Sequence, residues 1–240
     1  MQIIVCENYD QMSFQGAEII KSILLHNPSA VLGLATGSTP IGMYGLLAEA
    51  CARGEISFAA ARTVNLDEYV GLGEKDSQSY VHFMRENLFD KVDVPMANTH
   101  LPNGKAADLA AECARYSALL ATMPQDVQVL GLGSNGHIGF NEPGTPFDST
   151  TYVVRLTENT IRDNSRLFEK IEDVPVRAVT MGISEIMRAK RILVMASGKN
   201  KAKAVFGMVK GKITEDCPAS VLQRHADVTV VLDKDAASLL

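Results

Sequence analysis

The sequence lacks the marks of a secreted, membrane-bound or nucleic-acid-binding protein. Its four cysteines have no C-x-x-C spacing, which argues against both a disulfide framework and a zinc site. The N-terminus has neither the basic flank nor the long apolar core of a signal peptide, and no apolar run approaches the ~20 residues that span a bilayer. A net charge of −5 provides no general basic surface for nucleic acid. We therefore expect a soluble, cytoplasmic protein with no membrane and no nucleic-acid partner.

Linkers, internal repeats and low-complexity tracts are also absent, so residues 1–240 are expected to form a single domain. Continuous apolar runs such as 30–35, typical of parallel strands buried on both faces, alternate with helical patterns such as 11–25. This alternation predicts an α/β fold, with a single doubly wound, largely parallel sheet and helices on both faces. The runs 151–155 and 178–181 are expected to be strands of the same sheet.

A glycine-rich segment, 131–144, follows the apolar run 127–130 near the middle of the chain. A segment just past the end of a buried strand lies where open α/β sheets bind ligands. Asn135 and Glu142 lie close to His137 in this segment, so a carboxylate there can orient an imidazole for acid–base chemistry. We interpret the segment as part of an active site.

Two cofactor interpretations of this segment fail. The spacing Gly131-x-Gly133-x-x-Gly136 is similar to a dinucleotide fingerprint, which requires a helix next and an acidic residue ~20 positions later. Pro143 interrupts the following segment and the next predicted strand ends in Arg155, so we reject a nicotinamide site. No second histidine or cysteine stands at metal-ligand spacing from the histidine of this segment, so we expect no catalytic metal.

Two other strand ends carry polar groups whose role the residues alone leave open. The loop of Gly37, Ser38 and Thr39 precedes a predicted helix, where it could bind a phosphate or simply cap the helix. Lys201 begins another helix after a buried strand and could meet a phosphate as a point charge. Arg166 and Lys201 are both cations in or beside predicted helices, and the alternative for each is a solvated surface charge, as most such residues are.

Asp67 and Glu68 end a third predicted strand. A partly desolvated carboxylate at that position can act as a general base. The alternative is that one member of the pair caps the loop or faces water.

Three segments occur together in one order: Leu-Ala-Thr-Gly-Ser-Thr-Pro at 34–40, Asn-Leu-Asp-Glu-Tyr-Val-Gly-Leu at 65–72, and Gly-His-Ile-Gly-Phe-Asn-Glu-Pro at 136–143. With them the chain resembles the glucosamine-6-phosphate deaminase (glucosamine-6-phosphate isomerase) family, from the first predicted strand to the last. The resemblance implies a Rossmann-like fold of the sugar-phosphate isomerase/lactonase superfamily. It also implies isomerisation and deamination of glucosamine 6-phosphate to fructose 6-phosphate and ammonia in amino-sugar catabolism, without a metal or organic cofactor.

The resemblance also implies roles for residues of these segments. Asp67 matches the base that removes the C2 proton of the sugar. His137 matches the residue that opens the pyranose ring, and Glu142 matches its carboxylate partner. The positions implied in binding the substrate phosphate are Gly37, Ser38, Thr39, Arg166 and Lys201.

The sequence departs from the family pattern in two places. Many members carry an aspartate at Asn135; an amide cannot carry charge, so we keep Asn135 as a catalytic candidate that orients His137. Members activated by N-acetylglucosamine 6-phosphate have a basic segment after the central motif and a longer C-terminus. The segment 145–152 has no lysine or arginine and the chain ends at Leu240, so we expect an unregulated monomer or low-order homo-oligomer.

Two other functions remain as alternatives. A 6-phosphogluconolactonase-like hydrolase would share the fold, but there His137 would usually be followed by a threonine and small residues instead of the run 138–143. A non-enzymatic sugar-phosphate sensor would normally carry a DNA-binding segment and could lose its base, whereas Asp67 is present here. Both alternatives are therefore less favoured than the deaminase.

Overall fold

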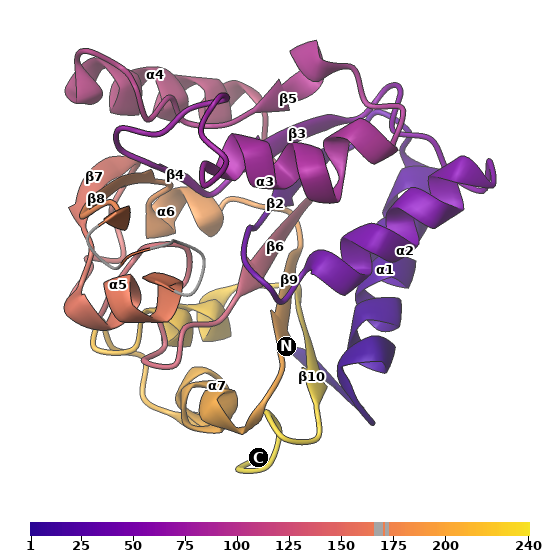
Figure 1. Ribbon diagram of the computed structural model, residues 1–240. Helices are drawn as coiled ribbons and strands as arrows, with labels where there is room; N and C mark the ends of the chain where they lie inside the picture. The colour runs from indigo at the N-terminus through magenta and orange to yellow at the C-terminus, as the bar shows by residue number, and fades with distance from the viewer. Residues whose placement is uncertain (166–169, 171–172) are drawn as a thin grey trace.

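The computed structural model describes residues 1–165, 170 and 173–240, and its centre is a parallel β-sheet (Figure 1). Every strand pair in this seven-stranded sheet is parallel. The inner strands β9, β6 and β2 are buried almost throughout, as expected of strands covered on both faces. In spatial order the strands are β1 (Gln2–Cys6), β10 (Val228–Asp233), β9 (Ile192–Ala196), β6 (Val127–Gly131), β2 (Val31–Leu34), β3 (Arg62–Asn65) and β5 (Thr99–His100).

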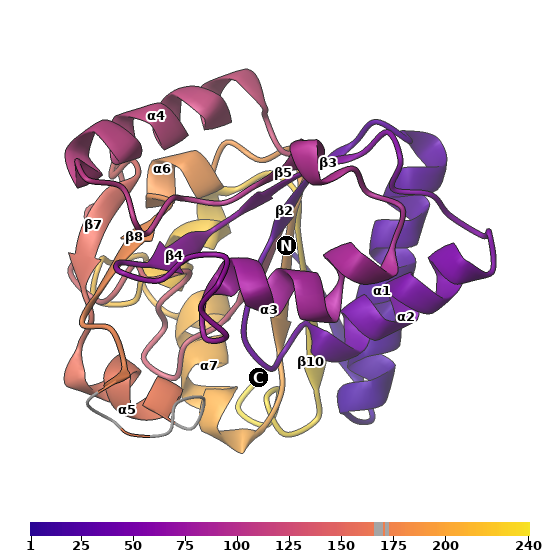
Figure 2. The same ribbon diagram turned by 45° about the horizontal axis from the view of Figure 1, so that its top comes forward.

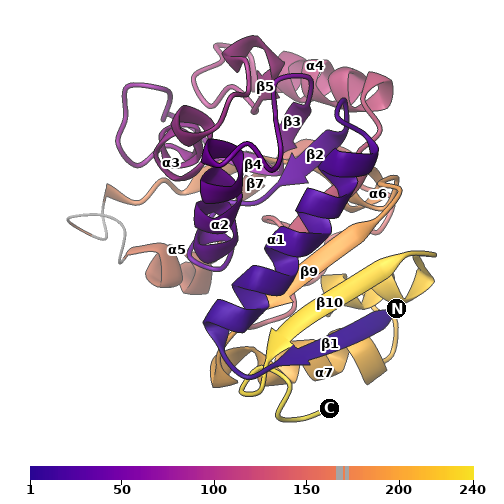
Figure 3. The same ribbon diagram turned by 90° about the vertical axis from the view of Figure 1, so that its right-hand side faces the viewer.

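Helices cover both faces of the sheet. α1 and α2 pack together on one face, and α7 with η5 lies on the other (Figures 1 and 3). α1 begins where the Asn8 side chain accepts a hydrogen bond from the Gln11 N–H, and it buries Met12, Ile20 and Leu24 against the core. The helices are α1 (Tyr9–His26), α2 (Ile41–Ala52), α3 (Tyr80–Asn87), α4 (Leu109–Thr122), α5 (Glu158–Ser165), α6 (Ile183–Ile186) and α7 (Ala202–Lys210), with 3₁₀ turns η1 (Phe89–Lys91), η2 (Met96–Asn98), η4 (Lys199–Lys201) and η5 (Pro218–Arg224).

A second, three-stranded antiparallel sheet corrects the expectation of a single sheet. β8 (Arg177–Thr180) pairs with β4 (Asp67–Tyr69) on one side and with β7 (Tyr152–Arg155) on the other. It lies between α4 and α5 (Figure 2). The runs 151–155 and 178–181 contribute Val154 and Ala178 to a small separate core, whereas Met181 belongs to the large core. The other buried members of the small core among the described residues are Tyr69, Phe140 and Leu156.

The order of the strands reverses in the middle of the large sheet. From β2 the chain continues outward through β3 to β5, then returns to β6 beside β2 and proceeds the other way through β9 to β10. The connections that follow β2 and β6 therefore diverge and leave a crevice at the carboxyl ends of the strands. The α/β architecture with a parallel sheet and helices on both faces is confirmed, and it places this crevice where the polar motifs are. Across the described ranges, none of the helices has the length and apolar character needed to cross a bilayer.

The two glycines of α2 provide a matched test of this packing. Gly45 is exposed and has open space where a Cβ would lie, so Gly45→Ala is expected to raise the free energy of unfolding by about 0.5–1 kcal/mol. A Cβ on Gly42 would lie 2.5 Å from the Ser13 Oγ, so Gly42→Ala is expected to lower that free energy through overpacking between α1 and α2. Urea unfolding measures both changes. Effects of the same sign would contradict this description of the α1–α2 contact.

Candidate active site

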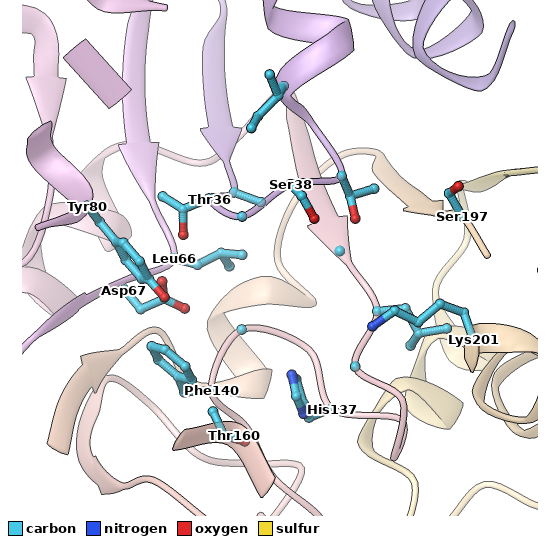
Figure 4. Close-up of a pocket in the computed structure, with 18 of the residues that line it drawn as sticks. Thr36, Ser38, Leu66, Asp67, Tyr80, His137, Phe140, Thr160, Ser197 and Lys201 are labelled. Carbon is cyan, nitrogen blue, oxygen red and sulfur yellow. The ribbon is translucent and has the colours of Figure 1, made fainter. Parts of the chain in front are cut away.

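A cavity of about 900 Å³ opens at the carboxyl ends of β2, β3, β6 and β9. Loops from all four strands contribute to its wall (Figure 4). The structure brings most of the residues selected from the sequence to this one place. Those that line the cavity are Gly37, Ser38, Thr39, Asp67, His137 and Lys201.

The loop after β2 forms one wall of the cavity. Gly37 has a φ of 94°, in the region that only glycine adopts readily. α2 then begins with Pro40 at its N-cap, and no side chain caps the helix. The N-cap residue itself thus provides no side-chain cap, and phosphate binding by the loop stays a prediction. Ser38 and Thr39 line the cavity beside the N–H groups of the first turn of α2, which have no acceptor within the helix.

The loop after β9 brings Lys201 to the same cavity. Asp233, at the end of β10, holds this loop by accepting hydrogen bonds from the Ser197 hydroxyl and the Gly198 N–H. Gly198 has a φ of 94°, which turns the chain into η4. The Lys201 side chain then extends toward the cavity, on the side away from Asp67 (Figure 4).

Asp67 lies at the opposite side of the cavity and is only 5% exposed. Its carboxylate is next to the aromatic rings of Tyr80 and Phe140 (Figure 4), which are nearly parallel with centroids 6.1 Å apart. Burial raises the pKa of Asp67 to about 8, with a smaller contribution from the neighbouring Glu68. A carboxylate with a raised pKa is a stronger base once it is ionised, which suits proton abstraction.

Glu68 is the member of the acidic pair that caps the neighbouring backbone. Its carboxylate accepts hydrogen bonds from the backbone N–H groups of Tyr69, Tyr80 and Val81 at 2.8 to 3.0 Å. It therefore holds the first turn of α3 beside the cavity. Burial raises the pKa of Glu68 to about 7, although these three donors oppose the shift.

His137 and Glu142 form the second acid–base group. The Nδ1 atom of His137 lies 3.5 Å from Oε2 of Glu142, and the imidazole is partly exposed to the cavity. Asn135 donates from its side-chain N–H to Glu142 Oε2 at 2.7 Å and accepts from the backbone N–H of His137 at 3.2 Å. Asn135 thus fixes the carboxylate and the backbone of the histidine, and does not bond to the ring.

The carboxylate of Glu142 is held by donors from two directions. Thr160 and Thr157, at the start of α5, donate their hydroxyls to Oε1, while Asn135 donates to Oε2. Burial alone would raise the pKa of Glu142, but His137, Thr160 and Asn135 together outweigh it and lower the pKa to about 2. Glu142 is therefore ionised at neutral pH and able to stabilise a protonated imidazole.

The glycines of the central segment leave room for this arrangement. A Cβ on Gly133 would lie 2.3 Å from the Nδ1 of His137, so the ring packs directly on the backbone there. Gly139 has a φ of 57°, and a Cβ on it would lie 3.4 Å from Oδ2 of Asp67. The closely spaced glycines therefore leave room for the side chains of His137 and Asp67, a role unrelated to dinucleotide binding.

Several wall residues were not found from the sequence. Tyr80, Thr160 and Arg162 line the cavity, and none of them stands in a segment whose spacing by itself indicates chemistry; Phe140 also lines it and lies within the glycine-rich segment, but was not selected as a site residue. Arg162 lies on α5, four positions before Arg166 in the sequence; Arg166, selected from the sequence, is outside the described residues. Within the described ranges, no three histidine, cysteine, aspartate or glutamate side chains are gathered closely enough to hold a metal ion.

Comparisons with known proteins by family model, by sequence and by structure agree with one another. Residues 9–231 match the family model of glucosamine-6-phosphate isomerases/6-phosphogluconolactonase. The chain is 51% identical to a glucosamine-6-phosphate deaminase of Enterococcus faecalis over 240 residues, covering all of both chains. It superimposes with a TM-score of 0.98 and 47% identity, over the full length of both, on the solved structure of a monomeric glucosamine-6-phosphate deaminase.

A more distant solved structure shares the fold. The 6-phosphogluconolactonase of Leishmania guyanensis superimposes with a TM-score of 0.79 at 24% identity, covering 98% of this chain and 97% of its own. The match of the family model over most of the chain, together with the deaminase at 51% identity, confirms the resemblance carried by the three sequence segments. The chain belongs to the glucosamine-6-phosphate isomerase/6-phosphogluconolactonase family.

Proposed function

We propose that the protein is a glucosamine-6-phosphate deaminase, which converts glucosamine 6-phosphate and water to fructose 6-phosphate and ammonia. One observation carries the proposal: a single cavity is lined by a buried carboxylate, Asp67, and by His137, whose imidazole lies beside the carboxylate of Glu142. The hydroxyl-bearing loop after β2 and Lys201 supply the anion-binding groups on the side away from Asp67. A phosphorylated sugar that must undergo two proton transfers at different atoms requires such an arrangement.

The first step is opening of the sugar ring. The cyclic sugar has no carbonyl group to acidify its C2–H bond, so the ring must open before that proton can leave. His137 takes the proton of the O1 hydroxyl and delivers a proton to the ring oxygen, and Glu142 stabilises the protonated imidazole between these transfers. Asn135 and Thr160 hold Glu142 in place while this occurs.

The second step is isomerisation. Asp67 removes the C2 proton of the open chain and returns a proton to C1, which leaves an imine at C2. Water then adds to C2 and ammonia leaves, giving the ketose. The phosphate, far from C1, holds the flexible open chain in register through Ser38, Thr39, Lys201 and the backbone at Gly37, and we assign the same role to Arg166.

We further propose that the protein acts as a monomer or low-order homo-oligomer in the cytoplasm and is not activated by N-acetylglucosamine 6-phosphate. The solved deaminase that it superimposes on over its full length is described as monomeric. All four cysteines are free thiols, which suits a reducing compartment. The lactonase alternative has weaker support, because the likeness to the Leishmania enzyme at 24% identity concerns the fold alone.

The activity itself is tested by incubating the purified protein with glucosamine 6-phosphate and measuring ammonia. Ammonia and fructose 6-phosphate are expected in equal amounts, and 6-phosphogluconolactone is expected to be hydrolysed no faster than in buffer. Acid release from the lactone without ammonia release from the amino sugar would instead establish the hydrolase.

The separate roles proposed for the two acid–base groups are tested with Asp67→Asn and His137→Gln. Asp67→Asn is expected to slow exchange of the C2 hydrogen with solvent by about 100-fold or more while the substrate still binds, because the base is lost. His137→Gln is expected to impair the cyclic sugar far more than an open-chain analogue. Asp148→Asn and His26→Gln, at exposed positions away from the cavity, are the matched controls. Full activity of both site variants would refute the assignment.

The burial of Asp67 also predicts a pH-dependent stability. The carboxyl has a pKa of about 8 in the folded protein and 3.8 in an ordinary setting, so the folded state holds its proton over that range and loses stability as pH rises through it. Asp67→Asn cannot ionise, so its melting temperature should equal that of the wild type near pH 4 and exceed it increasingly up to pH 8. At pH 8 the free energy of unfolding of Asp67→Asn should exceed that of the wild type by an amount on the order of several kcal/mol. A constant difference across this range, or one shared by Asp148→Asn, would contradict the desolvation of Asp67.

A further inference from the structure

Tyr9, the first residue of α1, connects this helix to the loop after β2. Its hydroxyl donates a hydrogen bond to the backbone carbonyl of Ser38 at 3.0 Å and accepts one from the backbone N–H of Gly42 at 2.9 Å. The two partners lie on either side of the N-cap of α2. One side chain therefore joins the loop to the first turn of the helix that follows it.

The first of these hydrogen bonds fixes the orientation of a peptide group in the loop. In a trans peptide the C=O and the following N–H point in opposite directions, and no peptide bond in the described part of the chain is cis. Because the carbonyl of Ser38 is directed to Tyr9, the N–H of Thr39 is directed away from Tyr9. Without the tyrosine hydroxyl this peptide group would be able to rotate and present its carbonyl oxygen, which repels anions, to the cavity.

The second hydrogen bond fixes the position of α2. The N–H of Gly42 belongs to the first turn, where N–H groups have no acceptor inside the helix. The contact is close because position 42 has no side chain: a Cβ there would lie 3.0 Å from the Tyr9 ring and 2.5 Å from the Ser13 Oγ. Ser13 is 2% exposed, and its hydroxyl has no hydrogen-bond partner among the described residues. At this contact the hydrogen bond that orients α2 is therefore the one made by Tyr9.

Tyr9 lines the cavity, but its hydroxyl has no proton to offer a ligand. A phenolic hydroxyl has a single O–H donor, and here that donor is committed to the Ser38 carbonyl. Direct binding of an anion by this hydroxyl would require breaking the hydrogen bond that orients the loop. The geometry therefore separates Tyr9 from the groups that contact the phosphate.

We propose that Tyr9 is a positioning residue that sets the affinity of the cavity for a phosphoryl group. It does so by holding the Ser38–Thr39 peptide and the first turn of α2 in the orientation that accepts an anion. The proposal rests on the proposed function in that it takes the loop after β2 as the phosphate-binding loop. It extends that function to a residue of α1, outside the three motif segments.

The test is Tyr9→Phe, which keeps the ring against Gly42 and removes only the hydroxyl. Titration calorimetry with inorganic phosphate is expected to show a dissociation constant raised about tenfold, the scale of losing hydrogen bonds near a charged ligand. The KM for glucosamine 6-phosphate should rise by a similar factor, while kcat stays within about twofold because Asp67 and His137 are untouched. Ser13→Ala, which removes an unpartnered hydroxyl from the same helix contact, should change neither constant.

Each outcome of this experiment decides the matter. A phosphate dissociation constant unchanged in Tyr9→Phe would overturn the proposal. A lower melting temperature and a lower kcat without a change in phosphate affinity would also overturn it, because Tyr9 would then be a purely structural residue. A wild-type protein that binds no phosphate would overturn it as well. Weakened phosphate binding in a protein whose wild type releases no ammonia would uphold the role of Tyr9 and reject the deaminase assignment instead.

Discussion

The reversal of strand order between β2 and β6 is the constraint on which the site depends. Because the chain proceeds outward in opposite directions from these neighbouring strands, their following loops separate and cannot fill the space between them. The loop after β2 contributes the hydroxyls and helix N–H groups, and the loop after β6 contributes His137. Lys201 after β9 and Asp67 after β3 complete the walls. Polar groups that follow four strands converge, although the first and last of them, Gly37 and Lys201, are more than a hundred positions apart in the chain.

Electrostatics then differentiates the carboxylates that the fold brings together. Asp67 lies beside aromatic rings, and burial raises its pKa to about 8. Glu142 is also buried, but the hydroxyl of Thr160, the amide of Asn135 and the imidazole of His137 lower its pKa to about 2. One acid is thereby suited to exchanging a proton with carbon, and the other to remaining a fixed negative charge.

The sequence predicts those features that depend on local pattern. Buried parallel strands read as apolar runs, and the motifs follow directly after them, so the parallel sheet and the positions of Asp67, His137 and Lys201 were predictable. The small antiparallel sheet was not, because β4 has only three residues and its partner β8 is more than a hundred positions away. The same limit applies to Glu68, whose hydrogen bonds to the first turn of α3 depend on how the chain folds back after Tyr69.

The presence of two separate cores has a consequence for motion. Leu66 belongs to the large core and Tyr69 to the small one, so Asp67 lies on the boundary between two units of unequal size. Opening the small unit exposes a core with five buried members among the described residues and leaves the large sheet intact, so it is the cheaper local unfolding event. In amide hydrogen exchange, β4, β7 and β8 would then form one weakly protected group beside strongly protected β2, β6 and β9. Asp67 would be carried by the weakly protected group, and the loop after β2 by the strongly protected one.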